Sequence, residues 1–165
     1  MAAVSKIVLD NAHIPSEVTA LLAKYAHVID SERFEEWPNL FTNPCTYQIT
    51  TRDNYDRGLP ISIIFCDSHG MLKDRVVSIR TANVFEPHRY RHIVSCIEII
   101  SEAENEWNLR SNYLVTRTMM NGTMSVFSTG EYKDIIVQKE DKFLFRERVV
   151  ICDHSVINNL IALPL

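Results

Sequence analysis

The dipeptide Asn121-Gly122 constrains the fold of this chain more than any other feature of its sequence. Both residue types accept positive φ angles, so a tight type I′ turn between two antiparallel strands is predicted there. The flanking segments, Leu109 to Met120 and Thr123 to Val137, are rich in β-branched and aromatic residues, which favour strands. We therefore expect a long β-hairpin in the second half of the chain.

Other segments extend this hairpin into a larger sheet. Lys139 to Asp141 is a second polar turn, after which another strand can return beside the hairpin. In the first half of the chain, the polar stretch Arg52 to Gly58 is predicted to be a loop between two short strands. The additional predicted strands are Cys45 to Thr51, Ile61 to Cys66, Tyr90 to Ile100 and Phe143 to Cys152.

Two amphipathic helices are predicted before the long strands. Pro15-Ser16 opens the first, because proline is tolerated in a first helical turn and serine can cap free amides. Its apolar residues then follow helical spacing up to Ile29. The other helix begins at Asp67 or Ser68 as its cap and runs through about Ala82.

A shorter helix is expected between these two. Asp30 and Ser31 are its predicted caps, Trp37 lies on its inner face, and Pro38 bends or restarts it. Asn43-Pro44 is predicted to end this helix in a turn.

The composition is that of an ordinary globular protein. With 165 residues, 46% hydrophobic and 23% charged, the chain suits one domain, residues 1–165, in which residues 1–13 are a loose extension. Helices gathered first and antiparallel strands last favour an α+β fold, with the N-terminal helices packed on a curved, mainly antiparallel sheet.

The net charge and the cysteines limit the partners and the cell compartment that can be expected for this protein. A net charge of −4 offers no basic field for nucleic acid, and no run of 18 apolar residues or secretory leader pattern is present. The four cysteines form no CxxC pair and are typical of reduced thiols in the cytoplasm. Neither a nucleic-acid partner nor a membrane is expected.

The densest polar cluster is the segment from Glu86 to His92. Glu86, His88 and His92 are candidate ligands for a non-haem iron, which two histidines and one carboxylate can bind. On a strand, however, His88 and His92 lie roughly 13 Å apart at about 3.3 Å per residue, which disfavours a shared metal. The preferred interpretation is that Arg89 and Arg91 make forked hydrogen bonds to a neighbouring chain.

A second cluster, Tyr25, His27 and Asp30, could supply a general acid or base to a pocket. Against this, Tyr25 falls on an apolar stripe and Asp30 is expected to cap a helix. The consecutive residues Asp153-His154-Ser155 cannot easily adopt triad geometry. The apolar tail from Val156 to Leu165 should dock on its own sheet or on a partner.

Taken together, these features make a familiar order. The chain resembles the β (small) subunits of aromatic-ring-hydroxylating dioxygenases over about Pro15 to Leu165, and the Glu36-Trp37-Pro38 and Ala162-Leu163-Pro164-Leu165 details look closest to the terephthalate dioxygenase branch. The residues that carry the resemblance are Tyr25, Asp30, Glu36-Trp37, Asp74-Arg75, Arg89-Tyr90-Arg91-His92-Ile93 and Arg146-Glu147-Arg148-Val149-Val150.

The resemblance implies the conical fold shared by nuclear transport factor and ketosteroid isomerase. It also implies a hexamer of three catalytic α chains and three structural β chains, the latter in contact with one another as a trimer. The α chain would carry a Rieske [2Fe-2S] cluster and a mononuclear iron, and a reductase or ferredoxin would deliver electrons from NADH. The holoenzyme would add O₂ to an aromatic ring, which in some members of the family carries a carboxylate, and the product would be a cis-dihydrodiol.

On this resemblance no catalytic residue, metal ligand or cofactor is expected in the present chain. The residues we expect at subunit interfaces are Arg89, Tyr90, Arg91, His92, Arg146, Arg148, Leu163 and Leu165.

Two other functions stay open. One is a stand-alone isomerase or dehydratase that uses the cone as a pocket, with Tyr25, Asp30 and His92 as candidate residues. The other is a small-ligand-binding module without chemistry. The isomerase predicts a deep pocket with a carboxylic acid or an imidazole at its bottom, whereas a packed cone interior counts against it.

Overall fold

The computed structural model describes residues 14–82, 86–154, 161 and 163–165. Six strands form one sheet in the order β2-β1-β6-β5-β4-β3. All neighbouring strands are antiparallel except β1 and β6, which are parallel. In chain order the elements are α1 (Ser16–Asp30), η1 (Phe34–Leu40), β1 (Phe41–Thr51), α2 (Arg52–Asp56), β2 (Ile64–Cys66), α3 (His69–Thr81), β3 (His88–Ala103), β4 (Glu106–Met119), β5 (Met124–Lys139) and β6 (Lys142–Cys152).

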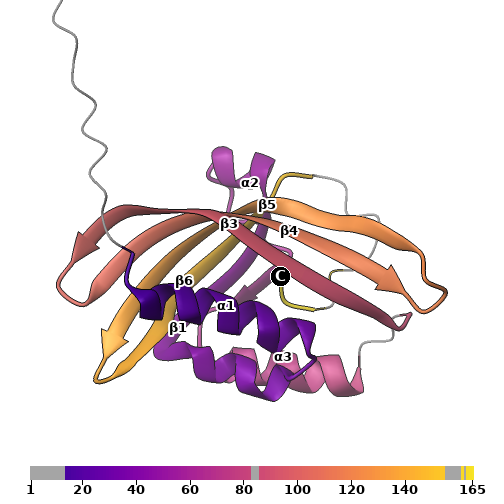
Figure 1. Ribbon diagram of the computed structural model, residues 1–165, viewed down its shortest axis with the longest axis horizontal. Coiled ribbons are helices and arrows are strands. Elements are labelled where there is room, and N and C mark those ends of the chain that lie inside the picture. The colour runs from indigo at the N-terminus through magenta and orange to yellow at the C-terminus, as the bar shows by residue number, and fades with distance from the viewer. Residues whose placement is uncertain (1–13, 83–85, 155–160, 162) are drawn as a thin grey trace, which may run out of the picture.

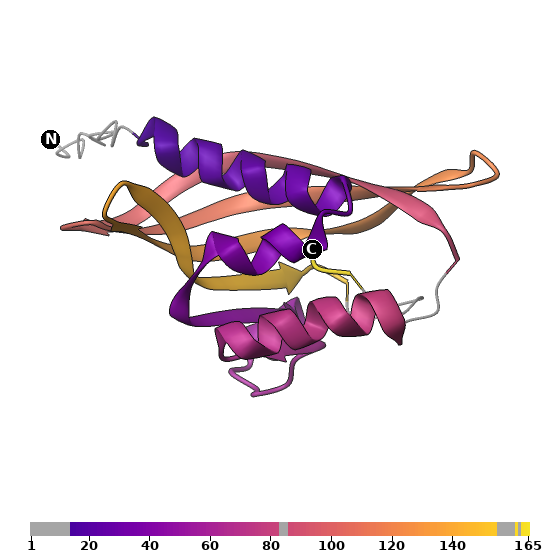
Figure 2. The ribbon, with the colours of Figure 1, turned by 90° about the horizontal axis from the view of Figure 1, so that it is seen from below.

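The sheet is strongly curved, and its long strands β3 to β5 arch over the helices (Figure 1). The view from below shows α1 and α3 on the same, concave side of the sheet (Figure 2). The predicted α+β architecture of helices on a curved, mainly antiparallel sheet is therefore confirmed. None of the described helices is long and apolar enough to cross a membrane.

Alternating burial along the strands places the core between the sheet and the helices. Tyr113 and Val115 of β4 and Tyr132 of β5 are buried, whereas the residues between them are more exposed, because successive strand side chains point to opposite faces. Helix α1 covers this face with the apolar stripe predicted from its spacing. Its buried residues are Val18, Leu21, Leu22, Tyr25, Ala26, Val28 and Ile29.

The hairpin at Asn121-Gly122 is confirmed, but the predicted turn type is wrong. Gly122 has a positive φ of 84°, whereas Asn121 is not among the non-glycine residues with positive φ, and a type I′ turn needs both. Gly122 N–H donates to Met119 O, Met119 N–H donates to Thr123 O, and the Asn121 side chain accepts from Thr123 N–H. This pattern is typical of a three-residue hairpin loop with a left-handed glycine.

The connection between α1 and β1 differs from the prediction. Its helix, η1, is a 3-10 helix whose N-cap is Arg33, so Asp30 and Ser31 do not cap it. Asn43-Pro44 does not end a helix in a turn but lies inside β1, with a cis peptide bond where the pairing of β1 with β6 shifts register. A local pattern could not find this strand extension, because it depends on pairing with β6.

The segment between β1 and α3 differs in smaller ways. The predicted loop from Arg52 contains the short helix α2, whose N-cap Thr51 accepts a hydrogen bond from Asn54 N–H. The strand predicted from Ile61 is restricted to β2, Ile64–Cys66. The Ser68 alternative for the α3 cap is confirmed, since the Ser68 hydroxyl accepts from Met71 N–H.

Candidate functional site

The interior of the cone is built around one ion pair. Asp134 of β5 and Arg148 of β6 are direct partners in the strand register, so their side chains project from the same face of the sheet. Arg148 Nε lies 2.8 Å from Asp134 Oδ1, and Arg148 Nη2 lies 2.7 Å from Asp134 Oδ2. Both side chains are only 1% exposed. This geometry is a forked, charge-assisted pair, the form in which a buried guanidinium is best compensated.

Aromatic rings enclose the Arg148 guanidinium. Its Cζ lies 4.0 Å from the ring centroid of Tyr25, 4.3 Å from that of Tyr132 and 4.3 Å from that of Phe145. Burial opposes its charge, but the Asp134 carboxylate outweighs this and keeps the pKa of Arg148 above its usual value. A large, permanently charged side chain therefore fills the space between Tyr25, Tyr132 and Phe145.

The last described residues pack into the same interior. Tyr25 Oη donates to Leu165 O at 2.8 Å, and Leu165 N–H donates to Tyr47 Oη at 3.0 Å. Ile161, Leu163 and Leu165 are buried in the same core cluster as α1 and the strands. The predicted docking of the apolar tail on its own sheet is thus confirmed for these residues; 155–160 and 162 lie outside the described ones.

The tyrosines of this interior are not poised as bases. Burial raises the pKa of Tyr25, and it raises the pKa of Tyr47 and Tyr132 well above the usual value for a phenol. All three phenols therefore stay neutral at physiological pH and act as hydrogen-bonding groups. The packed interior counts against the isomerase or dehydratase alternative.

The three pocket candidates of that alternative do not converge. Asp30 and His92 form a buried pair, with 2.6 Å between Asp30 Oδ1 and His92 Nδ1. The Tyr25 hydroxyl instead faces Leu165 and Tyr47. The expectation that Asp30 caps a helix is wrong, because its carboxylate binds both the backbone N–H and the ring of His92 and so ties the end of α1 to β3.

Three residues of the expected interface set are exposed. Arg89 is exposed on β3, the side chain of Arg91 is 67% exposed, and that of Arg146 is 45% exposed. Arg146 already holds Glu106 through two hydrogen bonds, and Arg91 Nη1 lies 3.6 Å from Asp30 Oδ2. Each guanidinium still presents surface to a second chain.

The other members of that set lie inside the chain. Arg148, Leu163 and Leu165 are 0%, 6% and 0% exposed because they pack in the chain's own core. Tyr90 and His92 are also buried, at 6% and 7%. Their burial within this chain leaves Arg89, Arg91 and Arg146 as the members of the expected set that present surface to another subunit.

The residues considered for iron do not assemble. His88 Nδ1 contacts Glu86 O, and His92 Nδ1 is engaged by Asp30. Two pairs that the sequence analysis did not consider, Cys66-x₂-His69 and Cys152-x-His154, also have spacings short enough for iron–sulfur ligands. The register places Cys66 beside Tyr47 of β1 and Cys152 beside Thr51, roughly 13 Å further along that strand at about 3.3 Å per residue. Within the described ranges, no group of three or more His, Cys, Asp or Glu side chains could hold a metal ion.

The Asp153-His154-Ser155 run does not act as a unit. Asp153 Oδ1 lies 3.4 Å from Arg52 Nη2, whereas His154 Nε2 lies 3.2 Å from Ser128 Oγ. Ser155 lies outside the described residues. The aspartate and the histidine therefore serve separate contacts at the end of β6.

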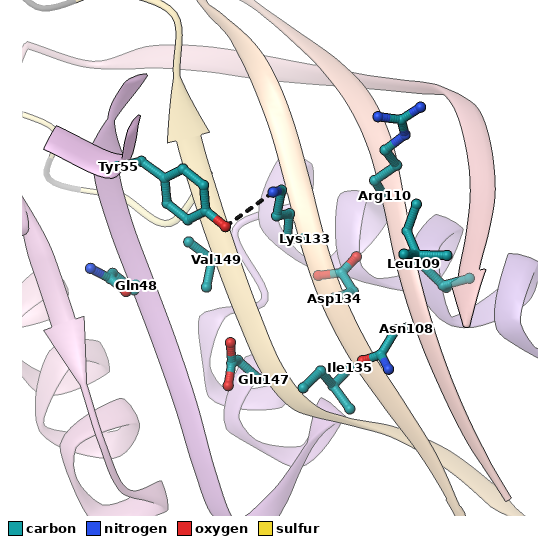
Figure 3. Close-up of a pocket in the computed structure, with 11 residues that line it drawn as sticks. Gln48, Tyr55, Asn108, Leu109, Arg110, Lys133, Asp134, Ile135, Glu147 and Val149 are labelled. Atoms are coloured by element: carbon teal, nitrogen blue, oxygen red, sulfur yellow. Dashed lines mark hydrogen bonds between the residues drawn. The ribbon is translucent and has the colours of Figure 1, made fainter. Parts of the chain in front are cut away.

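A cavity of about 550 Å³ on the opposite face of the sheet was not predicted. Figure 3 shows Tyr55 of α2 reaching Lys133 of β5, with 3.0 Å between Lys133 Nζ and Tyr55 Oη. Glu147 and Arg110 bring both signs of charge to the same hollow. Its lining comes from α2 and five strands, β1, β3, β4, β5 and β6, so the sheet register brings these residues together and no local sequence motif predicts the cavity.

Comparisons with known proteins agree with this geometry. Residues 24–159 match the family model described as ring hydroxylating beta subunit. The chain is 40% identical over 149 residues to the anthranilate 1,2-dioxygenase small subunit of Burkholderia cepacia, covering 90% of this chain and 92% of that one. It is equally 40% identical to the terephthalate 1,2-dioxygenase terminal oxygenase subunit beta 2 of Comamonas sp, covering 90% and 97%.

The fold is shared with solved structures. A β subunit assigned to an aromatic-ring-hydroxylating dioxygenase of Novosphingobium aromaticivorans superposes with a TM-score of 0.83 at 33% identity, covering 91% of this chain and 95% of that one. Together with structural neighbours of dehydratase type, this confirms the conical nuclear transport factor-like fold. The similarity spans the helices, the sheet and most of each chain.

Proposed function

This chain belongs to the family of ring-hydroxylating dioxygenase β subunits, and on that premise we propose that it is the structural subunit of an NADH-dependent holoenzyme and has no catalytic centre of its own. The observation that carries the proposal is 40% identity to two dioxygenase small subunits over nearly their whole lengths. The holoenzyme is an oxidoreductase that adds O₂ to an aromatic ring.

The packing of the cone supports a structural role. Arg148, Tyr25 and Leu165 occupy the space that a substrate would need, and the described residues bring no metal ligands together. We propose that the Rieske [2Fe-2S] cluster and the mononuclear iron lie in the α subunit, and that a reductase or ferredoxin delivers the electrons from NADH. A carboxylated ring is favoured as substrate because the relatives act on anthranilate and terephthalate.

For assembly we propose three α and three β chains, with the β chains in mutual contact. Arg89, Arg91 and Arg146 are the contact residues we retain, because their guanidinium groups reach solvent on one chain. We also propose that the protein resides in the cytoplasm, since Cys45, Cys66, Cys96 and Cys152 are all free thiols.

Co-expression with the cognate Rieske α subunit tests this proposal. We expect a complex of three α and three β chains by native mass spectrometry, with ring oxidation that requires the α chain and NADH. The isolated chain should bind no iron stoichiometrically and oxidise no arene. Iron bound by the isolated chain and lost in His88→Ala or His92→Ala would contradict the proposal, as would failure to associate with α.

A further inference from the structure

We propose that Ile161 and residues 163–165, the described part of the terminal segment, occupy a latent ligand site inside the cone, and that a small arene carrying a carboxylate or carboxamide binds there when the segment is displaced. This goes beyond the structural role above and does not depend on it. The juxtaposition that carries it is Leu165 between the hydroxyls of Tyr25 and Tyr47.

The described residues of this segment are held in the way a ligand is held. They belong to no helix or strand, yet Leu163 and Leu165 lie in the core at 6% and 0% exposure. Among the described residues, the two tyrosine hydroxyls hold Leu165, and Arg75 Nη2 donates to Ile161 O at 3.2 Å. A small-molecule site typically has an apolar lining and a few polar groups that point at the ligand, and the surroundings of this segment have both features.

Three further donors lie in the core around the tyrosines that hold Leu165. Arg148 Nη1, Tyr132 Oη and Trp37 Nε1 are buried and have no hydrogen-bond partner in the described part of the chain. Arg148 and Tyr132 adjoin Tyr25 through the guanidinium, and the Trp37 ring centroid lies 5.0 Å from that of Tyr47. Arg148 and Trp37 therefore each contact the ring of one of the two tyrosines that hold Leu165, and Tyr132 contacts the Arg148 guanidinium.

The balance of donors and acceptors defines the ligand. Within the described ranges, displacing the segment leaves the Tyr25 and Tyr47 hydroxyls with only each other as partners, 3.4 Å apart, beside the unpartnered groups of Arg148, Tyr132 and Trp37. Both Asp134 oxygens are already occupied by Arg148, so acceptors are scarce. A fitting ligand supplies oxygen acceptors, and the aromatic walls favour a planar ring.

The test uses the full-length chain with the occupant weakened and benzoate as the probe. L163A/L165A removes apolar bulk from the occupant while leaving every residue of the site in place. If the segment fills the site nine-tenths of the time or more in the wild type, its apparent Kd for benzoate is at least about tenfold weaker than that of the variant. Isothermal titration and the shift of Tm with benzoate measure this difference.

Three controls distinguish a specific site from a cavity that binds any apolar molecule. Toluene has the ring of benzoate but no acceptor, so it should bind L163A/L165A more weakly than benzoate does. Adding Tyr132→Phe to that variant removes one donor and should weaken benzoate binding. Ile93→Ala with Val126→Ala, which trims side chains 53% and 61% exposed on the surface, should create no benzoate binding.

Each result decides the matter. Equal benzoate affinity in the wild type and in a folded L163A/L165A, or toluene binding as tightly as benzoate, would overturn the inference. If L163A/L165A does not fold, Leu165→Ala alone is titrated in its place. Failure of both to fold would also overturn it, because the segment would then be an indispensable part of the core rather than a displaceable occupant.

Discussion

The carboxylate of Asp30, the last residue of α1, binds both the backbone and the ring of His92 on β3. Its oxygens lie 3.2 and 3.1 Å from His92 N, and Oδ1 lies 2.6 Å from His92 Nδ1. Both side chains are buried, at 2% and 0% exposure. The pair therefore fastens the N-terminal helix to the edge strand of the sheet.

Removing this carboxylate should destabilise the fold. Asp30→Ala leaves the His92 backbone and ring without their acceptor, and an unsatisfied buried donor costs about 1–3 kcal/mol. Urea unfolding measures the loss. Arg91→Ala is the matched control, because the Arg91 side chain is 67% exposed and its deletion should cost about 0.5 kcal/mol or less. Equal losses from the two substitutions would contradict this account.

Breaking the ion pair inside the cone should cost more. Arg148→Met leaves the Asp134 carboxylate buried without compensation, for which about 3–5 kcal/mol is expected. Combining Arg148→Met with Asp134→Leu removes the stranded charge and should recover most of that loss in guanidinium chloride unfolding. A double variant no more stable than Arg148→Met would show that the aromatic enclosure, rather than the charge balance, dominates.

Two glycine substitutions should act in opposite directions. A Cβ at Gly130 would overlap the Ile151 carbonyl and press on Tyr113, so Gly130→Ala should destabilise by about 1–3 kcal/mol. In α3, Gly70 has only Ser68 Oγ nearby, at 3.9 Å, and Gly70→Ala should stabilise by up to about 1 kcal/mol through helix propensity. Thermal unfolding of both variants checks this prediction: the Tm of Gly130→Ala should fall and that of Gly70→Ala should rise.

Thiol labelling should distinguish one cysteine from the others. Cys96 is exposed, whereas Cys45, Cys66 and Cys152 are buried. Burial raises the pKa of Cys45 and Cys152 and raises that of Cys66 to about 11, which suppresses their reactive thiolates at pH 8. Iodoacetamide should therefore modify Cys96 first in the folded protein, as followed by mass spectrometry. In Cys96→Ser, rapid labelling before unfolding would refute the assignment.

The contact between η1 and α3 should depend on pH. Hydrogen bonds from Arg80 lower the pKa of Glu35 from 4.5 to about 2 in the fold. Because the folded pKa is depressed, the stabilisation is present above about pH 4.5 and is lost as the pH falls through about 2. Glu35→Gln should lower Tm slightly at pH 7, and its difference from the wild type should vanish near pH 2. A difference that persists there would exclude this ion pair as the cause.

Local sequence signals located most secondary structure. The apolar spacing of α1 matched its buried stripe, and alternation along β4 and β5 matched their buried face. These signals failed where hydrogen bonding between strands overrides the conformational preference of the local sequence. Asn43-Pro44 reads as a turn, yet it lies in β1 because the register with β6 extends the strand through it.

What the sequence determined by itself was therefore the set of elements, the hairpin, and the family to which their order belongs. Which polar groups meet was decided only by the tertiary structure. Asp30 reaches His92 across 62 positions and Tyr25 reaches Leu165 across 140, while Arg148 meets Asp134 through strand register. Propensity acts between neighbours in sequence, whereas burial and register bring distant residues together, so the same Asp30 that resembles a helix cap becomes the partner of a histidine on β3.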